Sequence, residues 1–233
     1  KLQIKYDTDK KRIVSHSNQL ITIYDDEVED DADMLMEITY WQKEVDRIAS
    51  IPVASSTKKL VRAYGKESNM GNLFTDAIAA FDERIDVAVM NSGGLRQDID
   101  LGEITKGDLI SAFPFPNTIV MTKLKGFQLK KIFDHAAGMT NGILQVSQNG
   151  KYSFSPKNKV IEIWIKGELI NDNQDYWVAA PNFVTQGGDG YSEFQNSIEY
   201  IDSGVLIIDQ VENYLKGRKL YEPKYEGRVQ VIE

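Results

Sequence analysis

A glycine-rich segment that follows an apolar strand is the feature that most constrains how this chain can fold. Residues 176–180 are aromatic and small apolar residues that predict a strand. Residues 182–191 follow and contain three glycines in four positions, Gly187, Gly188 and Gly190. Because only glycine adopts positive φ without a steric penalty, we expect a tight backbone turn here.

Two side chains of this turn indicate a binding site. Phe183 precedes the glycines, and Asp189 lies among them. An aromatic face beside a carboxylate on a rigid turn suits a ring that carries a diol, such as a nucleoside. The alternative is a hairpin turn with a buried Phe183 and a solvated Asp189, and the motif by itself does not decide between the two.

Composition limits the classes of protein to which the chain can belong. With 233 residues, of which 42% are hydrophobic, it can form one large domain, or one domain with an appendage. A net charge of −8 argues against broad nucleic-acid binding and against binding to an anionic membrane surface. The chain has no cysteine, which excludes disulfides, thiolate zinc sites and a cysteine nucleophile. No apolar run approaches the roughly 18 residues of a membrane helix.

Three parts are expected along the chain. Apolar and polar residues alternate around residues 7–10 and again over 20–24, which predicts a strand pair. An acidic run follows and lacks the glycine and the terminal glutamate of an EF-hand loop, so we prefer a solvated helix start to a metal site. We therefore predict a strand pair over 1–30, a linker helix over 31–50 and a main domain over 51–233. The chain begins with a strand pattern rather than a signal peptide, so we expect it to start inside a longer protein.

The main domain mixes strands and helices without strict alternation. Stretches rich in apolar residues predict strands over 86–90, 119–124, 160–166 and 229–232. Apolar periodicity predicts one helix capped by residue 68 or 69, and others over 127–136 and 204–215. This order predicts an α+β fold with a mixed β-sheet and packed helices.

Two further loops carry groups that suit a phosphate. Lys66 lies just ahead of a predicted helix N-terminus, whose free backbone N–H groups favour an anion. A simple helix cap is the alternative. Asn91 ends a buried strand, two glycines follow, and Arg96 then offers a planar fork of donors that matches phosphate oxygens. A strand-ending turn with a surface arginine is the alternative there.

A third loop, residues 113–118, contains two prolines that stiffen the backbone on either side of Phe115. A buried loop aromatic is the commoner use of such a residue. If the loops converge, Phe115 and Phe183 can grip a base from both faces. Stacking of this kind contributes on the order of 1–3 kcal/mol per base in single-stranded nucleic-acid sites.

Five motifs occur in order along the main domain. They are Glu67-Ser68-Asn69-Met70-Gly71-Asn72-Leu73 with Asp76-Ala77, Asn91-Ser92-Gly93-Gly94-Leu95-Arg96, Gly102-Glu103-Ile104-Thr105, Pro114-Phe115-Pro116-Asn117-Thr118 and Gly187-Gly188-Asp189-Gly190-Tyr191. Together they resemble the C-terminal, substrate-binding domain of the 5′-nucleotidase / UDP-sugar hydrolase family. The likeness covers about residues 51–233, and residues 1–50 resemble the tail of that family's metallophosphoesterase domain and its linker.

The resemblance implies roles for the matching residues. In this family two Phe rings sandwich the base, and the matching residues are Phe115 and Phe183. The carboxylate of the glycine-rich turn holds the ribose hydroxyls, which assigns that role to Asp189. Asn91 and Asn117 would contact the base or the ribose.

Phosphate binding is implied for the two cations. The family arginine after the paired glycines matches Arg96. A second family arginine precedes the first motif, and Lys66 stands in its place here. Lysine keeps the charge and loses the fork, so phosphate affinity or substrate range is expected to differ.

Catalysis in the family depends on two metal ions held by the N-terminal domain, which activate a water and polarise the phosphoryl group. The resemblance therefore implies no catalytic residue, metal ligand or cofactor in this chain, and two divalent metal ions in a missing N-terminal domain. His16 and His135 lie outside any metal-ligand motif, and we expect both to be structural or surface residues.

The implied function is recognition of a nucleoside or nucleotide for an extracytoplasmic 5′-nucleotidase-like phosphohydrolase. The N-terminal metallophosphoesterase domain is the expected partner, and neither nucleic-acid binding nor a membrane span is expected. Two alternatives stay open. One is a non-catalytic nucleoside-binding module; the other is a sibling enzyme for 2′,3′-cyclic nucleotides, 3′-nucleotides, UDP-sugars or sulfur compounds.

Overall fold

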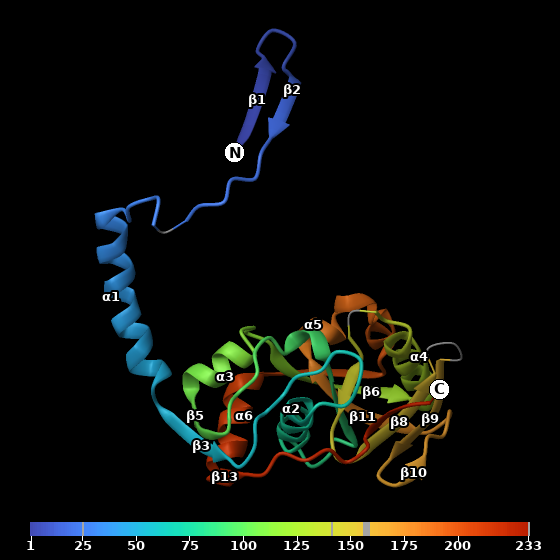
Figure 1. Ribbon diagram of the computed structural model, residues 1–233. Helices are drawn as coiled ribbons and strands as arrows, with labels where there is room; N and C mark the ends of the chain where they lie inside the picture. Colours follow the sequence, from blue (N-terminus) through green and yellow to red (C-terminus); the bar gives the residue numbers. More distant parts are fainter. Residues whose placement is uncertain (25, 141, 156–158, 233) are drawn as a thin grey trace. The chain divides into compact units, whose positions relative to one another are not determined.

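The computed structural model describes residues 1–24, 26–140, 142–155 and 159–232. The chain divides into two compact units, Lys1–Val45 and Asp46–Glu233. The division falls inside helix α1 (Ala32–Ala49), which Figure 1 labels near the N-terminal part of the chain. None of the described helices is long and apolar enough to cross a membrane.

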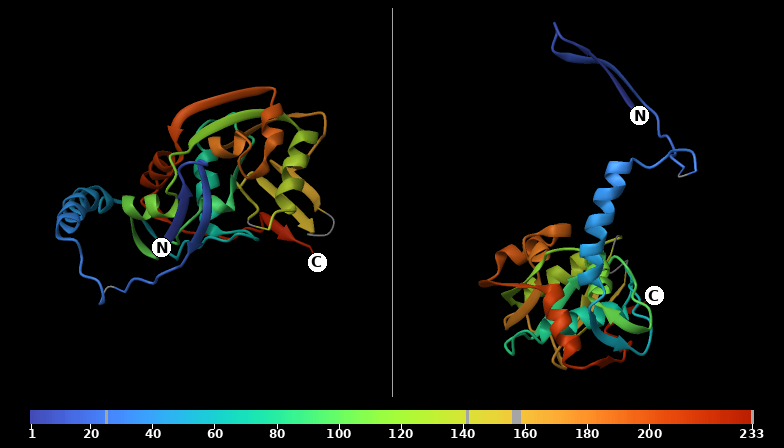
Figure 2. Two further views of the ribbon diagram at one scale, coloured as in Figure 1. Left: turned by 90° about the horizontal axis from the view of Figure 1, so that it is seen from above. Right: turned by 90° about the vertical axis from the view of Figure 1, so that its left-hand side faces the viewer.

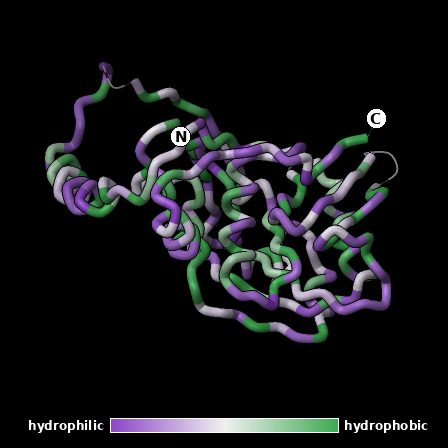
Figure 3. Tube along the Cα trace, turned by 90° about the horizontal axis from the view of Figure 1, so that it is seen from below, coloured by the Kyte–Doolittle hydropathy of each residue, from purple (hydrophilic) through white to green (hydrophobic). Residues whose placement is uncertain are grey.

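The first unit contains a β-hairpin. Strands β1 (Leu2–Asp7) and β2 (Arg12–Asn18) pair antiparallel. The Asp7 carboxylate closes the turn by accepting hydrogen bonds from the backbone N–H groups of Asp9 and Lys10. The strand pattern predicted over 20–24 is wrong, because β2 already completes the pair by Asn18. Helix α1 carries both hydrophobic and hydrophilic residues along its length, as Figure 3 shows.

A five-stranded mixed sheet forms the centre of the second unit (Figure 1). Its strands, in spatial order, are β12 (Glu199–Leu206), β6 (Thr118–Lys125), β11 (Asp175–Pro181), β4 (Val87–Asn91) and β7 (Leu144–Val146). Strands β11 and β4 run parallel, and the other neighbours run antiparallel. Figure 2 shows β12 lying beside β6 at one edge. This sheet with its packed helices confirms the predicted α+β class.

Strand β4 in the central sheet is buried on both faces: successive side chains of a strand point in opposite directions, and all five residues of β4 are buried. Val87 and Val89 of β4 join one hydrophobic cluster with helix α4 (Gly126–Ala137). Ala88 and Met90 join a second cluster with helices α2 (Asn69–Ala79) and α6 (Ile207–Lys216). Burial on both faces explains why residues 87–90 of β4 are all apolar.

Two smaller sheets complete the second unit. One contains β10 (Glu168–Leu169), β9 (Lys159–Ile165), β8 (Gly150–Ser155) and β14 (Val229–Val231), in that spatial order. The other contains β13 (Leu220–Tyr221), β3 (Pro52–Ser56) and β5 (Gly102–Thr105). The remaining helices are α2 (Asn69–Ala79), α3 (Lys106–Ala112), α5 (Asn182–Thr185) and α6 (Ile207–Lys216), and short 3-10 turns cover 92–94, 188–190 and 192–196.

Most predicted elements of the main domain are confirmed. The predicted strands correspond to β4, β6, β9 and β14, and two predicted helices correspond to α2 and α4. Ser68 is the N-cap of α2, where its side chain accepts a hydrogen bond from the N–H of Gly71. The helix predicted over 204–215 was placed too early. It begins at Ile207, because residues 204–206 finish strand β12.

Candidate functional site

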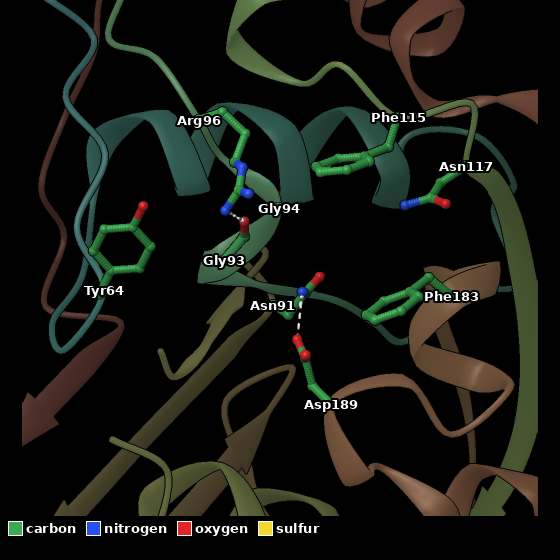
Figure 4. Close-up of a pocket in the computed structure, with 9 residues that line it drawn as sticks. All are labelled: Tyr64, Asn91, Gly93, Gly94, Arg96, Phe115, Asn117, Phe183 and Asp189. Carbon is green, nitrogen blue, oxygen red and sulfur yellow. Dashed lines mark hydrogen bonds between the residues drawn. The ribbon is translucent and has the colours of Figure 1, made fainter. Parts of the chain in front are cut away.

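One pocket of about 400 Å³ in the second unit collects six of the seven predicted binding residues. That volume suits a small-molecule ligand. Its lining consists of Tyr64, Asn91, Gly93, Gly94, Arg96, Phe115, Asn117, Phe183 and Asp189 (Figure 4). These residues come from four separate stretches of chain, and three of the stretches are loops that the sequence singled out.

The end of β4 and the turn after it supply polar side chains that line the pocket. Asn91, the last residue of β4, is buried, and its Nδ2 donates a hydrogen bond of 2.8 Å to Oδ2 of Asp189. The 3-10 turn that follows leads to Arg96, whose backbone N–H donates to the carbonyl of Ala112. Its exposed guanidinium donates from Nη1 to the carbonyl of Gly93 at 3.2 Å.

Phe115 forms one aromatic wall. It follows helix α3 in the Pro-Phe-Pro loop, and its ring contacts the buried ring of Phe113 edge-on, with centroids 5.7 Å apart. The guanidinium of Arg96 lies 5.7 Å from the centroid of Phe115. Phe115 is 38% exposed, so the alternative of a buried loop aromatic is wrong.

Phe183 forms the opposite wall, on the short helix α5. Its ring lies so close to Gly188 that a Cβ there would be 2.6 Å from two ring carbons. Gly187 has φ +91, Gly190 has φ +84 and Asp189 has φ +53, which confirms the expected positive-φ turn. Phe183 is 43% exposed, so the alternative with this ring buried is also wrong.

Figure 4 shows the rings of Phe115 and Phe183 on opposite sides of the pocket, with Asn117 beside the gap between them. Arg96 and Tyr64 lie toward the other end, and Asp189 lies on the same side as Phe183. The pocket therefore offers an aromatic slot, then a carboxylate, then a guanidinium. This order of groups matches a flat ring, a diol and an anion.

Residues 47–196 match the family described as 5′-nucleotidase, C-terminal domain. The chain belongs to the 5′-nucleotidase family. Trifunctional nucleotide phosphoesterase protein YfkN of Bacillus subtilis is 30% identical over 251 residues, which cover 96% of this chain and 17% of YfkN. Human 5′-nucleotidase is 28% identical over 262 residues, which cover 98% of this chain and 45% of that protein.

A solved structure has the same fold. The crystal structure of a 5′-nucleotidase precursor from Thermus thermophilus superposes with a TM-score of 0.81 at 25% identity. The match covers 99% of this chain and 49% of that one. This member of the 5′-nucleotidase family therefore spans less than half the length of these relatives.

Lys66 is the predicted site residue that does not line the pocket. It is exposed, and its backbone carbonyl accepts a hydrogen bond of 2.9 Å from Nε2 of Gln145. Tyr64 lines the pocket instead, although no sequence motif singled it out. The guanidinium of Arg62 donates to the Tyr64 hydroxyl at 3.1 Å. The assignment of a phosphate role to Lys66 stays a prediction.

Glu67 and Asp76 of the first family motif join two residues near the C-terminus in a network of hydrogen bonds and ion pairs, which we call the C-terminal anchor (Glu67, Asp76, Glu226 and Arg228). Arg228 is 6% exposed and donates both Nη1 and Nη2 to the carboxylate of Asp76 at 2.8 Å. Its Nε donates to Glu226 at 2.8 Å. Glu67 accepts the backbone N–H groups of Glu226 and Arg228. These contacts fasten the C-terminal segment onto helix α2 and the loop before it.

Tyr191 is the last residue of the glycine-rich turn of this 5′-nucleotidase domain, and its ring is buried. Burial, together with the nearby charge of Asp189, raises the pKa of the Tyr191 hydroxyl well above its usual value. The hydroxyl therefore stays protonated at physiological pH.

Among the residues that the structure describes, no group of three or more His, Asp and Glu side chains is placed to hold a metal ion.

Proposed function

We propose that this chain is the nucleoside-recognising part of a phosphohydrolase that releases phosphate from nucleotides. The observation that carries the proposal is the convergence of Phe115, Phe183, Asp189 and Arg96 on one pocket. The base stacks between the two rings, and the ribose hydroxyls donate hydrogen bonds to Asp189. Arg96 binds the phosphate.

The amide side chains complete the recognition of the nucleoside. Asn91 and Asn117 contact the base or the ribose, since an amide offers both a donor and an acceptor. Asn91 is already fixed by its hydrogen bond to Asp189, so little order has to be imposed when the ligand binds. Phe115 is likewise held in place by Phe113 before any ligand arrives.

The chemistry of phosphate release belongs to a separate N-terminal domain in this proposal. Two divalent metal ions there would activate a water and polarise the phosphoryl group. The relatives are at least twice as long as this chain, which supports such a domain. The family resemblance supports an extracytoplasmic location. We expect the purified 233-residue chain to show no metal-dependent hydrolysis of AMP. Substantial hydrolysis would contradict the proposal that catalysis takes place on a separate N-terminal domain.

A second candidate is a phosphoesterase for 2′,3′-cyclic or 3′-nucleotides. The similarity to a protein named as a trifunctional nucleotide phosphoesterase supports only the broader point that a relative has more than one activity on nucleotide esters. Such an enzyme would use the same contacts to base and ribose and would present a different phosphate ester. A panel of 5′-, 3′- and cyclic nucleotides given to the full-length protein separates the two candidates.

Calorimetric titration with adenosine tests the nucleoside site. Phe183→Ala should weaken binding by about 5- to 150-fold, because stacking contributes about 1–3 kcal/mol per base. Phe127→Ala is the matched control, since Phe127 is a comparably exposed phenylalanine that does not line the pocket. Unchanged binding in Phe183→Ala, or an equal loss in both variants, would refute the stacking role.

A further inference from the structure

His135 lies on helix α4 and does not line the pocket, but it contacts the glycine-rich turn. Its Nε2 is 2.8 Å from the backbone carbonyl oxygen of Asp189. A carbonyl oxygen only accepts hydrogen bonds, so Nε2 carries the proton and donates. The imidazole also contacts the ring of Tyr191 edge-on, with centroids 4.8 Å apart at 84°. The side chain is therefore held between the two residues that flank Gly190.

Gly190 leaves the space that this imidazole occupies. A Cβ at Gly190 would lie 2.9 Å from both Cε1 and Nε2 of His135. Any side chain at 190 would push the ring away from the turn, and the φ of +84 also disfavours one. The close approach of helix α4 to the turn thus depends on both residues.

The residue that His135 holds has an unusual backbone conformation. Asp189 has φ 53 and ψ 18, the left-handed region that is unfavourable for residues with a Cβ. In this conformation its carboxylate meets the amide of Asn91 inside the pocket. The hydrogen bond from His135 fixes the carbonyl of the same residue. A single residue is thus tied by its main chain to α4 and by its side chain to β4.

We propose that His135 is a positioning residue for ribose recognition: it holds Asp189 in the left-handed conformation that aims the carboxylate at the sugar hydroxyls. The proposal rests on the nucleoside site proposed above. It extends that site to a residue that never touches the ligand. A purely structural histidine would, in contrast, change stability or weaken all ligands equally.

Titration of the 233-residue chain with adenosine and with 2′,3′-dideoxyadenosine separates these roles. His135→Phe keeps a ring of similar size and loses the donor. It should weaken adenosine binding by about 3- to 10-fold, the effect of one lost hydrogen bond, and should change dideoxyadenosine binding by less than about twofold. His135→Gln keeps a side-chain N–H and should bind adenosine within about twofold of the wild type. Thermal melting confirms that each variant is folded.

Two further variants keep the test decisive. His135→Leu removes both ring and donor, and should show the same adenosine-specific loss if His135→Phe does not fold. Adding His135→Phe to Asp189→Ala should produce no further loss, because both changes remove one ribose interaction. Equal weakening of both nucleosides, no weakening, or failure of glutamine to rescue would each overturn the positioning role. Failure of the wild type to bind adenosine would instead overturn the proposed nucleoside site, and the inference with it.

Discussion

The pocket leaves its arginine open to a ligand, whereas the C-terminal anchor surrounds its arginine with acceptors. The guanidinium of Arg96 is exposed and donates to one backbone carbonyl, and it pairs with no carboxylate among the residues that the structure describes. Arg228 is buried and donates to two carboxylates and to the carbonyl of Val146. Satisfied donors stabilise the fold, and free donors remain available for a phosphate.

This difference divides the family motifs into two groups. The first motif, around Glu67 and Asp76, lies in the anchor and holds the C-terminal segment in place. The motifs around Arg96 and Asp189 line the pocket. The family motifs therefore include residues that stabilise the fold and residues that line the proposed binding site, and the hydrogen-bond partners of their side chains distinguish the two groups.

The largest effect is expected from Arg228→Met. It leaves the buried carboxylate of Asp76 without its ion-pair partner, which should lower the free energy of unfolding by about 3–5 kcal/mol. Urea denaturation followed by circular dichroism measures this change. Arg96→Met is the matched control and should change stability by less than about 0.5 kcal/mol, as at other surface positions. A loss below about 1 kcal/mol in Arg228→Met would show that the anchor is not structural.

Arg96→Met should produce the second largest effect, on ligand binding. AMP should bind at least about tenfold more weakly, because a hydrogen bond to a charged group contributes about 1.5–3 kcal/mol. Adenosine, which has no phosphate, should bind as it does to the wild type. Lys66→Met, at an exposed residue outside the pocket lining, measures whether the second cation takes part. An AMP loss in Lys66→Met that matches the loss in Arg96→Met would erase the distinction between pocket and surface cations.

The fold was predictable where local pattern and burial agree. Four consecutive apolar residues, 87–90, identified β4 because this strand is buried on both faces. The start of α6 differs from the prediction because Gly204-Val205-Leu206 completes strand β12, which pairs with β6. Pairing between strands that are distant in sequence cannot be recognised from the pattern of a few consecutive residues.

The site was predictable where a motif carries its own chemistry. Phe183 and Asp189 could be identified as candidate site residues because the glycines near them predict a turn with positive φ. Tyr64 and His135 could not, because their places depend on contacts with distant segments. His135 meets Asp189 across 54 residues of sequence, and nothing in the helix pattern of α4 distinguishes it from a surface histidine.

The smallest expected effect compares two adjacent glycines of the pocket lining, of which only Gly94 packs against the core residue Phe113. A Cβ at Gly94 would lie 2.9 Å from a ring carbon of Phe113, so Gly94→Ala should lower the free energy of unfolding by about 1 kcal/mol or more through overpacking. A Cβ at Gly93 meets only the side-chain nitrogen of Asn91, at 3.8 Å, so Gly93→Ala should change stability by less than about 0.5 kcal/mol. Thermal denaturation of the two variants side by side measures the difference. Because Phe113 supports Phe115, only Gly94→Ala should disturb the core and the aromatic wall together. Equal destabilisation by both substitutions would mean that the turn after β4 is as tightly packed on its pocket side as on its core side.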